Sequence, residues 1–284
     1  MDKIISQNLI SAIANKYNFR SAIIEKDYYL TIILNSINSD LTTNIVFKGG
    51  TLLNKIYFNY NRLSEDLDFC YHSEKPLNTR SQRSKAMIPI RDKMEMFLNG
   101  LGLRIKEPQG KGFNNSTQYL FIVLYNSIIT SKEEIIKIEI SLRQTLIDKP
   151  IYNNIKHFFQ DPFTNKDLLP KNKILTLTPA EAVAEKLKAA ITRKEVAIRD
   201  YYDLWYIANA KFNFFDEHFI NLFQKKLEYE KYKGDYKTNF GLTEKDIKIL
   251  HNQVEKDLLP VVKTNSGFDL TKVFEHFNKI LKDI

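Results

Sequence analysis

Two short segments in the first quarter of the chain constrain its fold more than any other feature. The first, residues 47–53, reads FKGGTLL, and the second, residues 64–69, reads SEDLDF. The apolar run before the glycine pair predicts a strand and the pair predicts a tight turn. Thr51 begins a predicted helix whose first backbone N–H groups are free to bind an anion. This order of strand, glycine turn and helix is typical of a phosphate-binding site.

The second segment places two carboxylates side by side. Residues 63–71 alternate apolar and polar side chains, which predicts a strand, so Asp66 and Asp68 point from the same face. Two such carboxylates can hold Mg²⁺ that bridges the phosphate oxygens of a nucleotide. Alone, a glycine pair or an aspartate pair is more often structural. Both together in this order favour nucleotidyl transfer.

A later strand supplies a third acidic candidate. Residues 135–142 alternate, with isoleucines on one face and Glu139 on the other. Glu139 is therefore a candidate for a third metal carboxylate. The alternative is an edge strand with a solvated polar face, and the alternation is compatible with both interpretations.

Several cations lie near these segments in sequence. Lys48, Lys55 and Arg62 could offset the charge of a triphosphate. Arg62 could equally pair with Glu65. Further upstream, the charged run EKDY at residues 25–28 lies in a predicted helix and, read alone, indicates a solvated face.

The second half of the chain carries another dense set of charges on two predicted helices. Lys186 and Arg193 are seven residues apart and so nearly aligned on one face. Asp200 and Asp203 are neighbours on the next helix. One hypothesis is that Lys186 contacts a triphosphate while one aspartate orients a lysine or the nucleobase. The other is a network of surface ion pairs, each contributing little to stability.

Composition bounds the possible partners. The 284 residues carry a formal net charge of +8, and Lys and Arg gain affinity for phosphate backbones by releasing counterions. A lysine-rich composition without such a partner explains the charge equally well. The single cysteine, Cys70, excludes an internal disulfide, and no apolar run is long enough to predict a membrane span. The first seven residues lack the apolar segment of a signal peptide, so we expect a cytoplasmic protein.

The chain is expected to divide into two domains, 1–170 and 171–284. Residues 148–173 are polar and contain three prolines, which exclude a long helix and favour a join. Before this stretch, predicted helices alternate with predicted strands, and after it the sequence is helical. The pattern predicts an α/β (α+β) first domain and a helical second domain.

Four segments in this order resemble the motifs of a known family. They are KGGT at 48–51, RLSEDLDF at 62–69, EKL at 185–187 with Arg193, and RDYYDL at 199–204. These segments are similar to the four motifs of the AbiEii/AbiGii abortive-infection toxins, which belong to the DNA polymerase beta-like nucleotidyltransferase superfamily. The run EKDY also resembles the N-terminal helix of that family.

The resemblance implies a nucleotidyltransferase-type mixed sheet with helices in the first lobe and a mostly helical second lobe. It also implies the toxin of a type IV toxin–antitoxin pair, encoded near its antitoxin, which transfers nucleotides from an NTP to an RNA such as the 3′ end of tRNA. The residues then expected to be catalytic are Asp66, Asp68, Lys186 and Asp200 or Asp203. Those expected to contact nucleotide are Lys48, Gly49, Gly50, Thr51, Arg62, Ser64, Lys186 and Arg193. Those expected to bind metal are Asp66, Asp68 and Glu139.

The expected chemistry is an in-line displacement with two Mg²⁺ ions, or Mn²⁺ in their place. One ion would lower the pKa of an RNA 3′-hydroxyl and the other would stabilise departing pyrophosphate, so no histidine is required. Two other functions stay open. One is transfer to a small molecule or a protein hydroxyl, and the other is nucleotide or RNA binding by an inactive centre.

Overall fold

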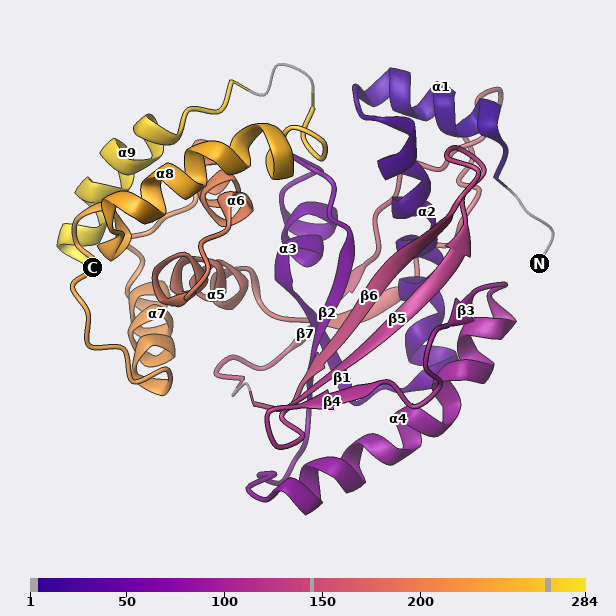
Figure 1. Cartoon of the computed structure of the whole chain (residues 1–284), viewed down its shortest axis with the longest axis horizontal. Helices are drawn as coiled ribbons and strands as arrows, with labels where there is room; N and C mark the ends of the chain where they lie inside the picture. The colour runs from indigo at the N-terminus through magenta and orange to yellow at the C-terminus, as the bar shows by residue number, and fades with distance from the viewer. Residues whose placement is uncertain (1–4, 144–145, 264–266) are drawn as a thin grey trace. The chain divides into compact units, whose positions relative to one another are not determined.

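The computed structural model of the chain describes residues 5–143, 146–263 and 267–284 (Figure 1). The chain divides into two compact units. The first unit runs up to Ile56 and continues over Leu63–Leu177. The second unit contains the short segment Tyr57–Arg62 and Thr178–Ile284. The spacing of apolar residues predicts a helix over residues 3–16, of which residues 3 and 4 lie outside the described residues.

A mixed sheet is the centre of the first unit, and eight strands of the described residues form it. Their order is β3-β5-β6-β2-β1-β8-β7, and β4 pairs with β5 outside this path. Strand β2 is antiparallel to β1 and parallel to β6. The strands are β1 (Ile45–Lys48), β2 (Asp66–Tyr71), β3 (Arg104–Ile105), β4 (Lys111–Phe113), β5 (Gln118–Asn126), β6 (Glu133–Ser141), β7 (Ile151–Asn154) and β8 (Lys173–Thr176).

One face of this sheet is buried and the other is more accessible. On β6, Ile136, Ile138 and Ile140 are fully buried, whereas Lys137 between them is exposed and Glu139 is half-buried. Strand β6 lies between β5 and β2, so the interpretation of an edge strand is wrong. The polar residues of β6 therefore lie on the accessible face of the sheet, away from its edges and next to those of β2.

Helix α2 (Ser21–Ser36) packs on the buried face of the sheet (Figure 1). Tyr29 of α2 stacks on Tyr125 of β5 with ring centroids 4.3 Å apart. The helix is apolar on all sides, which is typical of a helix enclosed by the protein. The remaining helical segments of this unit are α1 (Gln7–Tyr17), the π-helical η1 (Ile37–Leu41), α3 (Gly49–Leu52), the π-helical η2 (Leu53–Tyr57), whose last residue falls in the second unit, and α4 (Arg80–Gly100).

Two stretches differ from what the sequence predicts. The sequence GKG at residues 110–112 predicts a turn, whereas strand β4 begins at Lys111. The stretch 148–173, whose prolines exclude a long helix, contains β7 and the start of β8. These strands have only three or four residues, and β7 reads IYNN, so no alternating pattern marks them. The sequence predicts a helix over residues 80–99 that is kinked or interrupted at Pro89, and helix α4 continues through Pro89 without interruption. Its Arg83 and Arg91 donate to backbone carbonyls, so these two guanidinium groups fasten the helix to neighbouring loops.

The second unit is helical around an aromatic core. Tyr201, Phe240, Phe274 and Phe277 contact one another edge to face or tilted, and all are buried. Thr178 caps the first helix by accepting a hydrogen bond from the Glu181 backbone N–H. The helical segments are α5 (Pro179–Thr192), α6 (Ile198–Asn209), α7 (Glu217–Tyr229), the 3₁₀ turn η3 (Asn239–Gly241), α8 (Glu244–Gln253), the π-helical η4 (Val254–Leu258) and α9 (Leu270–Asp283).

Candidate active site

The glycine turn lies directly against the aspartate strand. Gly49 has a φ of +79°, a conformation that glycine adopts without strain. A Cβ at this position would lie 2.9 Å from the Cβ of Asp68 and would clash with its carboxylate. Two residues further along α3, the Thr51 hydroxyl donates to the backbone carbonyl of Asp66 at 2.5 Å. The structure therefore brings Gly49, Thr51, Asp66 and Asp68 together.

The register of three strands aligns further polar side chains with Asp68. Asp68 is paired with Lys48 of β1 on one side and with Glu139 of β6 on the other, and all three are half-buried. Paired residues of neighbouring strands project from the same face. Lys48 and Glu139 therefore share the face of the two aspartates. Ser64 is half-buried just before β2.

Asp66 and Asp68 are the candidate ligands for a divalent metal ion. Among the residues that the structure describes, no three His, Cys, Asp or Glu side chains converge as a metal site would require. Asp66 and Asp68 alone suit Mg²⁺, because this ion is commonly bound by one or two carboxylates with substrate phosphates and water completing its shell. The donor set therefore fits an ion that arrives with a nucleotide.

The charged run on α2 is buried, so its interpretation as a solvated face is wrong. Glu25 accepts hydrogen bonds from the Ser127 hydroxyl and the Ile128 backbone N–H. Asp27 pairs with Lys55, and both side chains are at most 3 % exposed. Lys55, predicted to offset a triphosphate charge, is thus bound to a carboxylate. The apolar residues on every side of α2 were the signal, since such a helix has no polar face to present.

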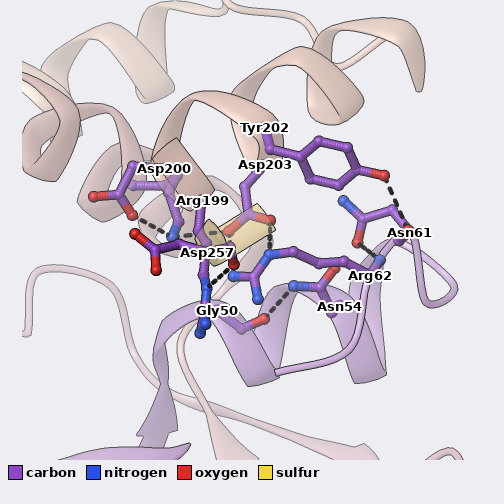
Figure 2. A network of polar contacts seen from close by, with 10 residues as sticks. Gly50, Asn54, Asn61, Arg62, Arg199, Asp200, Tyr202, Asp203 and Asp257 are labelled. Atoms are coloured by element: carbon purple, nitrogen blue, oxygen red, sulfur yellow. Dashed lines mark hydrogen bonds and ion pairs between the residues drawn. The ribbon is translucent and has the colours of Figure 1, made fainter. Parts of the chain in front are cut away.

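A second cluster of charges is buried in the helical unit. Lys186 of α5 lies 2.8 Å from Asp200 Oδ1 and 2.9 Å from Asp203 Oδ2, both on α6. Arg62 donates to both oxygens of Asp203, at 2.7 and 2.9 Å (Figure 2). All four side chains are nearly inaccessible to solvent. The hypothesis of surface ion pairs is therefore wrong, because these pairs are in the interior.

The segment that carries Arg62 is fixed by further hydrogen bonds. The Tyr202 hydroxyl donates to the carbonyl of Asn61, and the Asn61 side chain accepts from the Arg62 backbone N–H (Figure 2). Arg62 also forms a β-bridge with Val262. Arg62 therefore pairs with Asp203, and Glu65 lies 3.4 Å from Lys26. Local spacing gave no signal for this pairing, because Arg62 and Asp203 are 141 positions apart.

The two aspartates of α6 differ in how many of their carboxylate oxygens accept hydrogen bonds. Both oxygens of Asp203 accept hydrogen bonds from Arg62. Burial would raise the pKa of Asp203, but the charges of Arg62 and Lys186 outweigh it and lower this pKa to about 2. Asp200 binds Lys186 through Oδ1, whereas no hydrogen bond within the described residues reaches its buried Oδ2. Within the described residues, Arg193 lies 3.3 Å from that oxygen, and the Arg193 side chain is 53 % exposed.

Lys186 is held in its charged form by this arrangement. Burial lowers the pKa of its ammonium group, but the carboxylates of Asp200 and Asp203 act more strongly and raise the pKa above its usual value. Arg199, the first residue of the RDYYDL segment, instead donates to the carbonyl of Asp257 (Figure 2). Lys186, Asp200 and Arg193 are therefore the residues of this cluster that retain capacity for a ligand.

Comparison with known proteins decides the family. The family model described as the nucleotidyl transferase AbiEii toxin of a type IV toxin–antitoxin system matches residues 32–275. The chain belongs to the AbiEii family. It is accordingly a nucleotidyltransferase toxin, with an NTP as substrate and an antitoxin as partner. The family predicted from the KGGT, SEDLDF and RDYYDL segments is confirmed.

Solved structures show the same fold. MenT4, a nucleotidyltransferase toxin from Mycobacterium tuberculosis H37Rv, matches with a TM-score of 0.63 at 18% identity, covering 99% of this chain and 90% of that one. JHP933 from Helicobacter pylori matches with a TM-score of 0.51 at 17% identity, covering 93% and 92%. The predicted fold class is confirmed by the mixed sheet and by the similarity of these solved structures. Among curated proteins, none matches the chain. Over the described part of this AbiEii chain, no helix has the length and apolar character needed to cross a membrane.

Proposed function

We propose that this AbiEii toxin transfers a nucleoside monophosphate from an NTP to the 3′-hydroxyl of an RNA, with the 3′ end of tRNA as acceptor. The single observation that carries the proposal is the contact between the glycine turn at Gly49 and the Asp68 carboxylate. A phosphate-binding turn beside paired carboxylates suits displacement at a phosphorus atom, which depends on positioning and charge stabilisation. The net charge of +8 suits a polyanionic acceptor, and NTP and tRNA as substrates imply a cytoplasmic reaction.

In this proposal the residues of the first unit bind the triphosphate. The backbone N–H groups that follow Gly49 and Gly50 bind phosphate oxygens, because the first N–H groups of a helix have no partner within it. Lys48 offsets phosphate charge, and its register beside Asp68 supports this role. Ser64 is assigned to the nucleotide by its motif alone.

Asp66 and Asp68 would hold the divalent ion, Mg²⁺ or Mn²⁺. When bound, the ion neutralises phosphate charge and lowers the pKa of the attacking hydroxyl. Glu139 shares their face through its pairing with Asp68. We assign it to the electrostatics of this face rather than to metal ligation, because three acids do not converge among the described residues.

The buried cluster of the helical unit divides into one substrate-contacting part and one positioning part. Asp200 is proposed as the fourth-motif acid, because its Oδ2 is buried and accepts no hydrogen bond in the part of the chain described. Lys186 and the half-exposed Arg193 are proposed to contact the nucleotide. Asp203 and Arg62 are proposed to hold Lys186 in place, since the guanidinium already occupies both oxygens of Asp203.

The test is a labelling assay with radioactive NTPs. Wild-type protein, Asp66→Ala and Asp68→Ala are each incubated with the four NTPs singly, MgCl₂ and total cellular RNA, and the products are separated by size. We expect label in the tRNA band with wild type only, and a loss of at least about a hundredfold in both variants. Label found in protein or in a small molecule would identify that molecule, instead of RNA, as the acceptor. If wild type labels nothing beyond Asp68→Ala while nucleotide binding persists, the protein acts as a binding module.

A further inference from the structure

Three consecutive residues of α2 each contact a different segment of the first unit. Glu25 accepts from the Ser127 hydroxyl at 2.5 Å and from the Ile128 backbone N–H at 2.6 Å. Lys26 lies 3.4 Å from Glu65. The Glu25 side chain, which accepts these two hydrogen bonds, is fully buried.

Asp27 makes the closest of these ion pairs. Its two oxygens accept from the Lys55 ammonium group at 2.8 and 3.0 Å, and both side chains are almost completely buried. Burial lowers the pKa of Lys55, and the Asp27 carboxylate counteracts this effect. The pKa of Lys55 stays below its usual value, and the pair joins the two side chains directly in the interior.

The three contacted segments are those that carry the candidate site. Lys55 lies in η2, which continues the short helix α3 that begins at Gly49. Glu65 directly precedes Asp66, and Ser127 begins the connection from β5 to β6, the strand of Glu139. One turn of α2 thus contacts the glycine-turn helix, the start of the aspartate strand and the strand connection beyond it.

Stability alone does not account for such a pair. Removing two charges from water costs several kcal/mol, and replacing a buried ion pair by well-packed apolar residues is often neutral or stabilising. What such a pair adds is a fixed contact between the two elements that it joins, because neither buried charge can lose its partner without a large cost. In this unit those elements are α2 and the helix that follows the glycine turn.

We propose that residues 25–27 form a positioning element that fixes the glycine turn relative to the aspartate strand for nucleotide transfer. This inference rests on the proposed function. The Asp27–Lys55 pair sets the α3–η2 helix, while Glu25 and Lys26 set the flanking segments. Asp27 and Lys55 are positioning residues and touch no substrate.

The test replaces the pair by apolar residues of similar volume. Asp27→Leu/Lys55→Met leaves no unpaired charge, so we expect it to unfold at the wild-type temperature or higher. Its kcat/KM for NTP should nevertheless fall at least about tenfold, because small misplacement of reacting groups is costly. Lys55→Arg, which keeps the charge, should retain more activity than Lys55→Met.

The matched control is the buried pair of the helical unit, replaced as Glu181→Leu/Lys226→Met. Glu181 and Lys226 are equally buried, and neither is assigned to the candidate site. Lys226 also lies 2.7 Å from Glu185, whose side chain is 17 % exposed and so keeps access to solvent in this variant. We expect this variant to keep kcat/KM within about twofold. A Asp27→Leu/Lys55→Met variant with both wild-type stability and wild-type kcat/KM would overturn the proposal.

A second measurement separates this proposal from the proposed function. Amide hydrogen exchange is followed by mass spectrometry in peptides covering residues 48–53 and 65–69. We expect faster exchange of these peptides in Asp27→Leu/Lys55→Met and unchanged exchange in the control variant. If wild type transfers no nucleotide, the proposed function fails, and exchange alone decides the positioning role. Unchanged exchange at residues 48–53 overturns it.

Discussion

Gly49 packs against the carboxylate of Asp68 so closely that no side chain fits between them. The strand that ends before the glycine pair is also paired with the aspartate strand, so one register sets both halves of the candidate site. The turn and the acids therefore move together as one piece of structure. A change that shifts the glycine turn should therefore also displace the aspartate carboxylates.

Gly49→Ala tests this contact. The substitution combines the strain of a φ of +79° with a clash against Asp68. We expect transfer to fall at least about a hundredfold. Gly102→Ala is the matched control, because Gly102 has a φ of +74° and no heavy atom within 4 Å of an added Cβ. It should lose about 1 kcal/mol of stability and keep its activity. Equal activity in the two variants would contradict a role for the close approach.

The three carboxylates on the accessible face should not contribute equally. Asp68→Asn is expected to lower kcat at least about a hundredfold, because it removes a proposed ion ligand. Glu139→Gln is expected to lower kcat no more than about tenfold, because Glu139 is assigned an electrostatic effect and no contact with the ion. Initial rates measured over a series of Mg²⁺ concentrations check this. If Glu139→Gln needs far more Mg²⁺ than wild type, Glu139 is an ion ligand after all.

The two aspartates of α6 should separate into one that serves activity and one that serves stability. Asp203→Asn leaves Arg62 buried beside a neutral partner, and loss of one partner of a buried pair costs about 3–5 kcal/mol. Asp200→Asn should destabilise less and lower transfer more. Urea unfolding and kcat/KM of both purified variants provide the measurement. Asp203→Asn with full stability and no activity would reverse the assignment.

The depressed pKa of Asp203 predicts a pH dependence of stability. Because its pKa is about 2 when folded and 3.8 as a reference, the carboxylate binds fewer protons in the folded state. Its contribution is therefore fully present above the reference value and is lost as the pH falls from 3.8 to about 2. The loss amounts to about 2 kcal/mol. Unfolding free energies of wild type and Asp203→Asn, compared between pH 6 and pH 3, should converge as the pH falls.

The parts of the site that follow local rules were predictable. The glycine pair and the two aspartates are recognisable because a turn and an alternating strand leave a short-range pattern. The buried ion pairs could not be predicted, because their partners are far apart in the sequence. Arg62 and Asp203 are separated by 141 positions, and Lys55 and Asp27 by 28 positions. The burial of the charged run at residues 25–27 could not be predicted from the run itself, because its residues are polar. The composition of the rest of α2 determined its burial.

The segment Tyr57–Arg62 has a consequence for how the protein can be divided. It belongs to the helical unit although the residues before and after it belong to the sheet unit. A fragment that ends at Leu177 would carry the Arg62 guanidinium without the carboxylate that neutralises it. The complementary fragment would hold Asp203 and Lys186 without that guanidinium. Neither fragment is therefore expected to be stable when expressed alone. After a single cut near residue 177, the segment Tyr57–Arg62 would still hold the two fragments together.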